Sequence, residues 1–227
     1  MARAPQDKFL RENYGSFLKS IGDKPAALAE YLQVVEGLPH DFYACLQAGR
    51  LLGELRRLKE AELLLRRAAA QRPSLPDAWF ELGVVLAAGA KYAEALESFE
   101  RVAKMHPSDG ACLTSKARVL SKLNRRPEAI QNYREVIRLN PGSWEAHSEL
   151  AGELVAADQA AESIPEYLEA VRFNPRHPIL RLNLGVMFAR QNRLDEAIQQ
   201  FEFVLRLDPT NVAASDYLRQ VTARRNY

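Results

Sequence analysis

The chain has few residues of the kinds that carry out covalent or metal chemistry. Its 227 residues include two cysteines, Cys45 and Cys112, and four histidines. The sequence contains no glycine-rich phosphate loop, no histidine pair at helical metal-binding spacing and no nucleophile motif. Its many Glu and Asp residues are of the kind that usually forms the solvated face of helices. The sequence therefore predicts no catalytic residue, no metal site and no cofactor, and we expect the protein not to be an enzyme.

The spacing of the prolines indicates which structural elements would position these residues. Seven of the twelve prolines recur at a constant step: Pro5, Pro39, Pro73, Pro107, Pro141, Pro175 and Pro209. A fixed period of this length, about 34 residues, predicts stacked copies of one supersecondary unit. Such an architecture favours binding over catalysis as the function.

Other columns of the repeat indicate two helices per unit. One column is always Gly or Ala (Gly15, Gly49, Gly83, Ala117, Ala151 and Gly185), and another is mostly aromatic (Tyr31, Leu65, Phe99, Tyr133, Tyr167 and Phe201). Small residues let two helices approach to about 8 Å, and the ring fills the space beside that contact. Between the two helices, Gly22, Asn124, Asp158 and Asn192 share a column suited to the left-handed residue that ends a helix.

The third unit carries the pattern Trp79, Leu82, Gly83, Leu86, Ala95, Phe99 and Pro107. This pattern resembles the tetratricopeptide repeat (TPR) family, with Leu86 in place of Tyr, and the resemblance extends from Lys8 to Asn211. It implies an all-α fold, a right-handed α-solenoid of stacked antiparallel helix pairs. Pro165 falls inside a second helix and predicts a late start or a kink there.

The period divides the chain into six repeats and two ends. Residues 1–7 are an N-terminal extension, in phase with the ends of later repeats as though an upstream repeat preceded them. The repeats are 8–41, 42–75, 76–109, 110–143, 144–177 and 178–211, and residues 212–227 form a C-terminal solvating helix, predicted at about Val212–Arg225. We expect one solenoid without an internal linker and thirteen helices in all.

The same columns place the cysteines and histidines. Cys45 and Cys112 occupy buried columns of first helices, which favours core thiols. His40, His106 and His177 lie in turns of different repeats, too far apart to share a metal whose bonds are about 2 Å long. His147 stands in the column of Trp79, which favours packing over ligation.

Composition narrows the class of partner. Apolar residues make up 47% of the chain, charged residues 26%, and the net charge is +2. This balance gives no general attraction to nucleic acid or to a membrane surface. The longest apolar run, Leu82–Ala90, is shorter than the roughly 20 residues that cross a bilayer. With no apolar leader in Met1–Asp7 and no disulfide pattern, we expect a cytoplasmic protein.

The resemblance implies that the first helices line a groove that binds an extended or helical segment of a partner. The residues that it places in this groove are Phe9, Asn13, Tyr43, Leu46, Gln47, Arg50, Asp77, Phe80, Glu81, Arg118, Lys122, Glu145, Glu149, Leu182, Asn183 and Arg190. Tyr43, Leu46, Phe80 and Leu182 are the expected apolar anchors. Asp77 with Glu81, and Glu145 with Glu149, predict two acidic spots on either side of a basic one.

Two known modes of TPR recognition lack their residues here. The clamp for acidic chaperone tails begins with a Lys, and its position holds Glu12, Leu46, Phe80, Thr114, Ser148 and Leu182. The asparagine ladder of O-GlcNAc-transferase type reads Asn13, Gln47, Glu81, Ser115, Glu149 and Asn183. We therefore expect neither of these two modes of recognition.

Three functions follow from these observations. The favoured one is a protein-interaction scaffold that binds another protein or a peptide segment. The second is the substrate-recruiting part of a larger enzyme, such as a glycosyltransferase or a sulfotransferase. The third is an RNA-binding helical repeat, against which the acidic spots and the small net charge argue.

The first helix also predicts an association edge. Leu10, Tyr14, Phe17 and Ile21 recur at spacings of four, three and four, on the side where a preceding repeat would stack. An apolar outer face on a terminal repeat favours association. We expect this edge to be covered by a second copy, an upstream segment or a partner domain.

Overall fold

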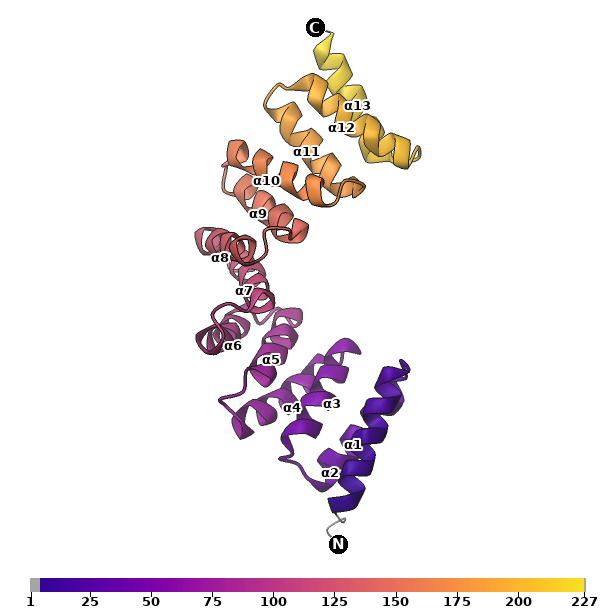
Figure 1. The fold of residues 1–227 in the computed structure, drawn as a ribbon, viewed down its shortest axis with the longest axis vertical. Helices are drawn as coiled ribbons and strands as arrows, with labels where there is room; N and C mark the ends of the chain where they lie inside the picture. The colour runs from indigo at the N-terminus through magenta and orange to yellow at the C-terminus, as the bar shows by residue number, and fades with distance from the viewer. Residues whose placement is uncertain (1–4, 227) are drawn as a thin grey trace. The chain divides into compact units, whose positions relative to one another are not determined.

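The structure is a computed structural model that describes residues 5–226, with side chains from Asp7 onward. These residues form thirteen α-helices and no strand (Figure 1). The predicted fold class, an all-α helical-repeat solenoid, is confirmed. Residues 1–4 of the expected N-terminal extension lie outside the described part, and Pro5–Asp7 already belong to the first helix.

The helices alternate in a fixed order along the chain. The odd-numbered ones, called first helices below, are α1 (Pro5–Ser20), α3 (Phe42–Glu54), α5 (Pro76–Ala88), α7 (Gly110–Lys122), α9 (Trp144–Ala156), α11 (Pro178–Arg190) and α13 (Val212–Arg225). The second helices are α2 (Lys24–Gly37), α4 (Leu58–Gln71), α6 (Tyr92–Met105), α8 (Arg126–Leu139), α10 (Ala160–Phe173) and α12 (Leu194–Leu207).

The helices form two compact units, Met1–Leu123 (unit 1) and Asn124–Tyr227 (unit 2). Within unit 1, each helix from α1 to α7 packs on the next, and the first helices α3, α5 and α7 also contact one another in sequence. Within unit 2, each helix from α8 to α13 packs on the next, and α11 contacts α13. The boundary between the units falls inside the range assigned to the fourth repeat.

Polar caps start most of the first helices at the same point of the period. Asp41 accepts a hydrogen bond from the Ala44 amide at 2.9 Å, and Asp109 accepts one from the Ala111 amide at 2.9 Å. Ser143, His177 and Asn211 cap α9, α11 and α13 in the same way. Each cap satisfies an amide that the first turn leaves without an intrahelical partner, so local sequence sets where these first helices begin.

A left-handed residue ends each first helix from α1 to α11. Gly22, Asn124, Asp158 and Asn192 have φ angles between 61° and 88°, as their column predicts. Arg56 and Ala90 occupy the same column and also adopt positive φ, at 63° and 59°. The geometry of the helix end is therefore imposed even where the residue itself disfavours it, since only glycine adopts this conformation without steric cost.

The small-residue column and the ring column meet as predicted. A Cβ atom added to Gly83 would lie 2.8 Å from the Phe99 ring, and one added to Gly185 would lie 2.6 Å from the Phe201 ring. Phe99 and Phe201 are almost fully buried. Glycine at these positions therefore lets the ring of the second helix lie directly against the backbone of the first.

Two further expectations concern single helices. The C-terminal helix spans Val212–Arg225, as predicted. Helix α10 begins at Ala160, in the same register as the other second helices, so Pro165 does not delay its start. Of the two predicted effects, the late start does not occur, because the helix continues through the proline at its sixth residue, and the kink stays a prediction.

Candidate binding surface

The candidate surface lies along the first helices, at the places where consecutive first helices face each other. We call each such place a junction and name it by its two helices. Unit 1 contains three junctions, α1–α3, α3–α5 and α5–α7. Because the period is constant, equivalent positions of the repeat can be compared from one junction to the next.

The α1–α3 junction is linked by polar side chains. The Ser16 hydroxyl is 2.9 Å from the Tyr31 hydroxyl and 3.3 Å from that of Tyr43. Lys19 donates a hydrogen bond to Gln47 at 3.1 Å. Tyr43 also packs edge-on against Tyr31 and keeps 40% of its surface exposed. This junction offers one aromatic surface, held in place by its neighbours.

A buried carboxylate lies at the outer end of the same junction. Lys8 pairs with Asp41 at 2.5 Å, while the nearest oxygen of Glu12 is 3.8 Å from Lys8 and has no hydrogen-bond partner. Burial raises the pKa of Glu12 above its ordinary value. The pKa of Asp41 is lowered, because the Ala44 amide and the Lys8 ammonium outweigh the opposing effect of burial.

The α3–α5 junction is linked by an ion pair. Arg50 donates from Nε to Glu81 at 2.7 Å, beside a cavity of about 370 Å³. The side chain of Glu81 is 13% exposed and that of Arg50 is 43% exposed. The expectation of an acidic spot at Asp77 and Glu81 needs correction, because Glu81 is neutralised by the arginine of the preceding first helix.

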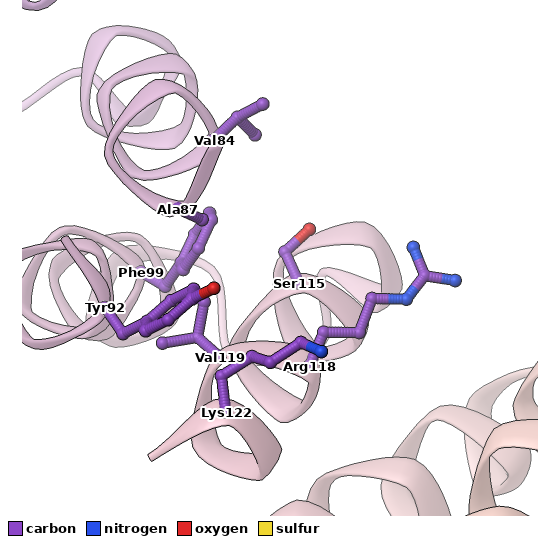
Figure 2. Close-up of a pocket in the computed structure, with 8 residues that line it drawn as sticks. All are labelled: Val84, Ala87, Tyr92, Phe99, Ser115, Arg118, Val119 and Lys122. Atoms are coloured by element: carbon purple, nitrogen blue, oxygen red, sulfur yellow. The ribbon is translucent and has the colours of Figure 1, made fainter. Parts of the chain in front are cut away.

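The α5–α7 junction holds an apolar pocket instead of an ion pair. The pocket has a volume of about 250 Å³ and is lined by Val84, Ala87, Tyr92, Phe99, Ser115, Arg118, Val119 and Lys122. Figure 2 shows Val84, Phe99 and Tyr92 around one side of the opening and Ser115, Arg118 and Lys122 of α7 around the other. Phe80 packs edge-on against Phe99, with 5.8 Å between ring centres. The pocket thus combines an apolar interior with positive charge at its rim.

The expected groove residues differ in how much surface they offer. Phe9, Asn13, Tyr43, Arg50, Asp77, Arg118, Lys122, Glu145 and Arg190 are exposed, while Gln47, Phe80, Glu81, Glu149, Leu182 and Asn183 are partly buried. Leu46 is only 8% exposed, so it belongs to the core of unit 1 and offers almost no surface to a partner. In unit 2, burial raises the pKa of Tyr167, against the opposing effect of its hydrogen bond with Asn183.

Sequence reasoning missed part of the pocket. Tyr92 lies on a second helix and Val119 is buried, so neither stood out as a groove residue. A signal was present in the period: Val84 and Ser115 stand one full repeat after Arg50 and Glu81. That exchange removes both charges of the ion pair at the next junction.

The expected association edge on α1 is exposed. Leu10, Tyr14, Phe17 and Ile21 retain between 53% and 67% of their surface, and the rings of Tyr14 and Phe17 stack at 6.4 Å. At the other end of the chain, the stripe of α13 that would face a following helix, Ser215, Arg219 and Thr222, is polar. Whether anything covers the α1 edge stays a prediction.

The residues considered for covalent or metal chemistry serve the structure. Cys45 and Cys112 are fully buried, and burial raises the pKa of Cys112 to about 11. Buried His147 lies between Glu166, at 2.7 Å, and the carbonyl of Pro141, at 3.2 Å. Within the described residues, no three His, Cys, Asp or Glu side chains come close enough together to hold a metal ion. Both thiols thus belong to the core, and His147 has a hydrogen-bond partner at each ring nitrogen.

Across residues 5–226, no helix combines the length and the apolar character needed to span a bilayer.

Tandem antiparallel helix pairs with a small-residue contact and a ring beside it define a helical-repeat protein. The tetratricopeptide repeat family profile matches residues 46–110, 114–157 and 150–212. These ranges cover most of the chain, so the chain belongs to the tetratricopeptide repeat family. A comparison of the sequence with curated proteins found no match.

Several solved structures share the fold. The pilF protein of Pseudomonas aeruginosa superposes with a TM-score of 0.77 at 15% identity, over 95% of this chain and 98% of that one. YrrB, described as a TPR protein with an unusual peptide-binding site, has a TM-score of 0.68 at 20% identity, over 82% of this chain and 96% of YrrB. An APC/C hetero-tetramer, Cut9–Hcn1, has a TM-score of 0.70 at 14% sequence identity, over 96% of this chain and 44% of that one. At these identities the likeness shows the fold alone.

Proposed function

We propose that this protein is a non-catalytic interaction scaffold whose first helices bind a segment of a partner protein. The observation that carries the proposal is the set of surface side chains held in place along α3, α5 and α7. Tyr43 is braced by Tyr31, and Phe80 is braced by Phe99. Anchored aromatic side chains with exposed faces are the commonest hot spots of protein interfaces, because they bury much area at little cost in entropy.

The family and two of the structural neighbours support this proposal. YrrB is described as having a peptide-binding site, and the Cut9–Hcn1 structure is an assembly of different chains. Binding of this kind needs only shape, apolar anchors and charge. The alternative, a substrate-recruiting part of a larger enzyme, would use the same surface.

The test replaces both aromatic anchors in the full chain. Tyr43→Ala with Phe80→Ala should weaken binding of a captured partner by roughly 10-fold or more, as expected for central anchors. Partners would be captured from lysate by the wild-type protein, identified by mass spectrometry, and then purified for titration against both proteins. Circular dichroism would confirm that the variant remains helical.

Leu63→Ala supplies the matched control, because Leu63 is 53% exposed on the second helix α4. It should leave the affinity for the purified partner unchanged. An equal loss from Leu63→Ala, with no loss from the double variant, would move the binding surface to the second helices and overturn the proposal.

A further inference from the structure

The α5–α7 pocket differs in chemistry from the same place one repeat earlier. Arg50 and Glu81 join the first helices at the α3–α5 junction, whereas their equivalents at the α5–α7 junction are Val84 and Ser115. The exchange removes the ion pair, so that the α5–α7 pocket is apolar where the cavity of the α3–α5 junction is lined by Arg50 and Glu81. At the rim the change runs the other way, because Arg118 and Lys122 take the positions that Val84 and Ala88 hold one repeat earlier. Thus the charged side chains lie on both helices at the α3–α5 junction, but only on α7 in the lining of the α5–α7 pocket.

The charged side chains that line this pocket have a single sign. Its lining contains two cations and no carboxylate. Arg118 and Lys122 are four residues apart on α7, so they lie on one helical face. Figure 2 shows Lys122 running along the opening, while the guanidinium of Arg118 points away from it. Lys122 is exposed, and its ammonium is the charge available to a bound group.

The size of the pocket limits what it holds. Its volume of about 250 Å³ is below the roughly 300–1,000 Å³ of pockets that enclose small molecules. It is suited to one large apolar side chain, which would contact the Phe99 ring, Val84 and Ala87. A backbone carrying that side chain would pass beside Lys122, where a carboxylate on a neighbouring residue forms a charge-assisted contact.

We propose that this pocket receives an apolar side chain from an acidic segment of a partner protein, with Lys122 pairing with a carboxylate next to that side chain. The inference rests on the proposed function, since it names the kind of segment that the first helices bind. The charge sets orientation and specificity, and the apolar side chain supplies most of the affinity.

The experiment selects ligands without assuming their sequence. The full chain is immobilised, a random peptide library displayed on phage is selected against it, and the enriched peptides are synthesised and titrated by fluorescence anisotropy. We expect enriched sequences in which a Leu, Ile, Phe or Met lies beside Asp or Glu. Their binding should weaken as salt is raised, because the rim charge is exposed to solvent.

Two variants then test the pocket directly. Ala87→Phe fills it and should lower the affinity of the selected peptides about 10-fold, while Lys122→Glu reverses the rim charge and should lower it by a similar factor. Lys122→Arg should retain binding. Ala93→Phe and Lys104→Glu, on exposed positions of α6 outside the lining, are the matched controls and should have no effect. If Ala87→Phe does not fold, Val84→Asp takes its place.

The outcomes separate the two proposals. Enriched peptides of another chemistry, or acidic ones insensitive to the pocket variants, would overturn this inference and leave the proposed function standing. Failure to enrich any peptide would count against the proposed function itself. Phosphatidylserine vesicles that bind the wild-type protein, but not Lys122→Glu or Ala87→Phe, would assign the pocket to lipid and also overturn the inference.

Discussion

The α3–α5 and α5–α7 junctions share one backbone pattern but have opposite surface chemistry. At the first, Arg50 and Glu81 span the gap between the helices and neutralise each other. At the second, Val84 and Ser115 leave the gap apolar, and both cations that line the pocket lie on α7. The comparison shows that a repeat protein can keep its packing columns constant while side chains exchanged at a junction replace a cavity lined by an ion pair with an apolar pocket.

The largest expected effect comes from the column that both junctions share. Gly83→Leu should lower the free energy of unfolding by roughly 1–3 kcal/mol, because the added side chain overpacks the contact with Phe99. The Phe99 ring also lines the α5–α7 pocket, so the change should impair both stability and binding there. Thermal unfolding followed by circular dichroism measures the first effect.

Gly110→Ala is the control for that experiment, since a Cβ atom at Gly110 meets nothing within 4 Å. It should leave the melting temperature of the protein almost unchanged. Unchanged melting of Gly83→Leu would contradict the role assigned to the small-residue column.

A pH-dependent effect of smaller size is expected at the α1–α3 junction. Because the pKa of Glu12 is raised in the folded protein, its ionisation costs stability as pH rises above the ordinary Glu value of about 4.5. Glu12→Gln should therefore stabilise the protein at pH 7, and the gain should disappear as pH falls toward 4.5 and below. Urea unfolding across this pH range measures it.

Asp41→Asn should change the stability in the opposite direction and destabilise the protein at pH 7. The pKa of Asp41 is lowered in the folded protein, so the stability that its charge contributes is present above the ordinary value of about 3.8 and is lost at lower pH. Asparagine keeps the capping acceptor for the Ala44 amide but removes the charge facing Lys8. The same unfolding measurements also test Glu12. A loss of stability from Glu12→Gln at pH 7 would contradict the prediction for Glu12 and show that its charge stabilises the fold through Lys8.

The smallest expected effect on stability is the sharpest test of the comparison. Arg50→Val, Glu81→Ser and Ala88→Lys together give the α3–α5 junction the facing residues and the rim lysine of the α5–α7 junction. The partly exposed ion pair contributes about 1 kcal/mol or less, so unfolding should change little. The peptides selected for the α5–α7 pocket should still bind there with unchanged affinity, and a second, weaker site should appear in the titration.

No second site is expected from Lys59→Val with Glu97→Ser, which exchanges exposed charges on second helices. Loss of the original site in the Arg50→Val, Glu81→Ser, Ala88→Lys variant would show that the two junctions do not act independently.

Much of the local architecture could be predicted from sequence because it depends on interactions within a few residues. The helix Val212–Arg225, the buried columns and the left-handed positions at Gly22, Asn124 and Asn192 all follow from periodicity and end signals. Arg56 and Ala90 adopt the same conformation without such a signal. Their positive φ angles show that packing of the helix pair outweighs the preference of the single residue.

Pairing and burial of the surface side chains could not be predicted in the same way, because they depend on distances between helices that the sequence alone does not give. Arg50 and Glu81 lie on different helices of different repeats, and only the stacking of α3 on α5 brings their side chains together. Leu46 occupies a column that holds the partly exposed Phe80 one repeat later, yet neighbouring helices bury it almost completely.

The sequence by itself determined the family, the order of the helices and the residues that close each pair, because a short period repeats the same local hydrogen bonds and contacts. The tertiary structure decided which polar side chains neutralise each other, which apolar ones remain accessible and where a pocket opens. These outcomes depend on the reach of side chains between helices, and exchanges among the surface residues of a junction change them without disturbing the repeat.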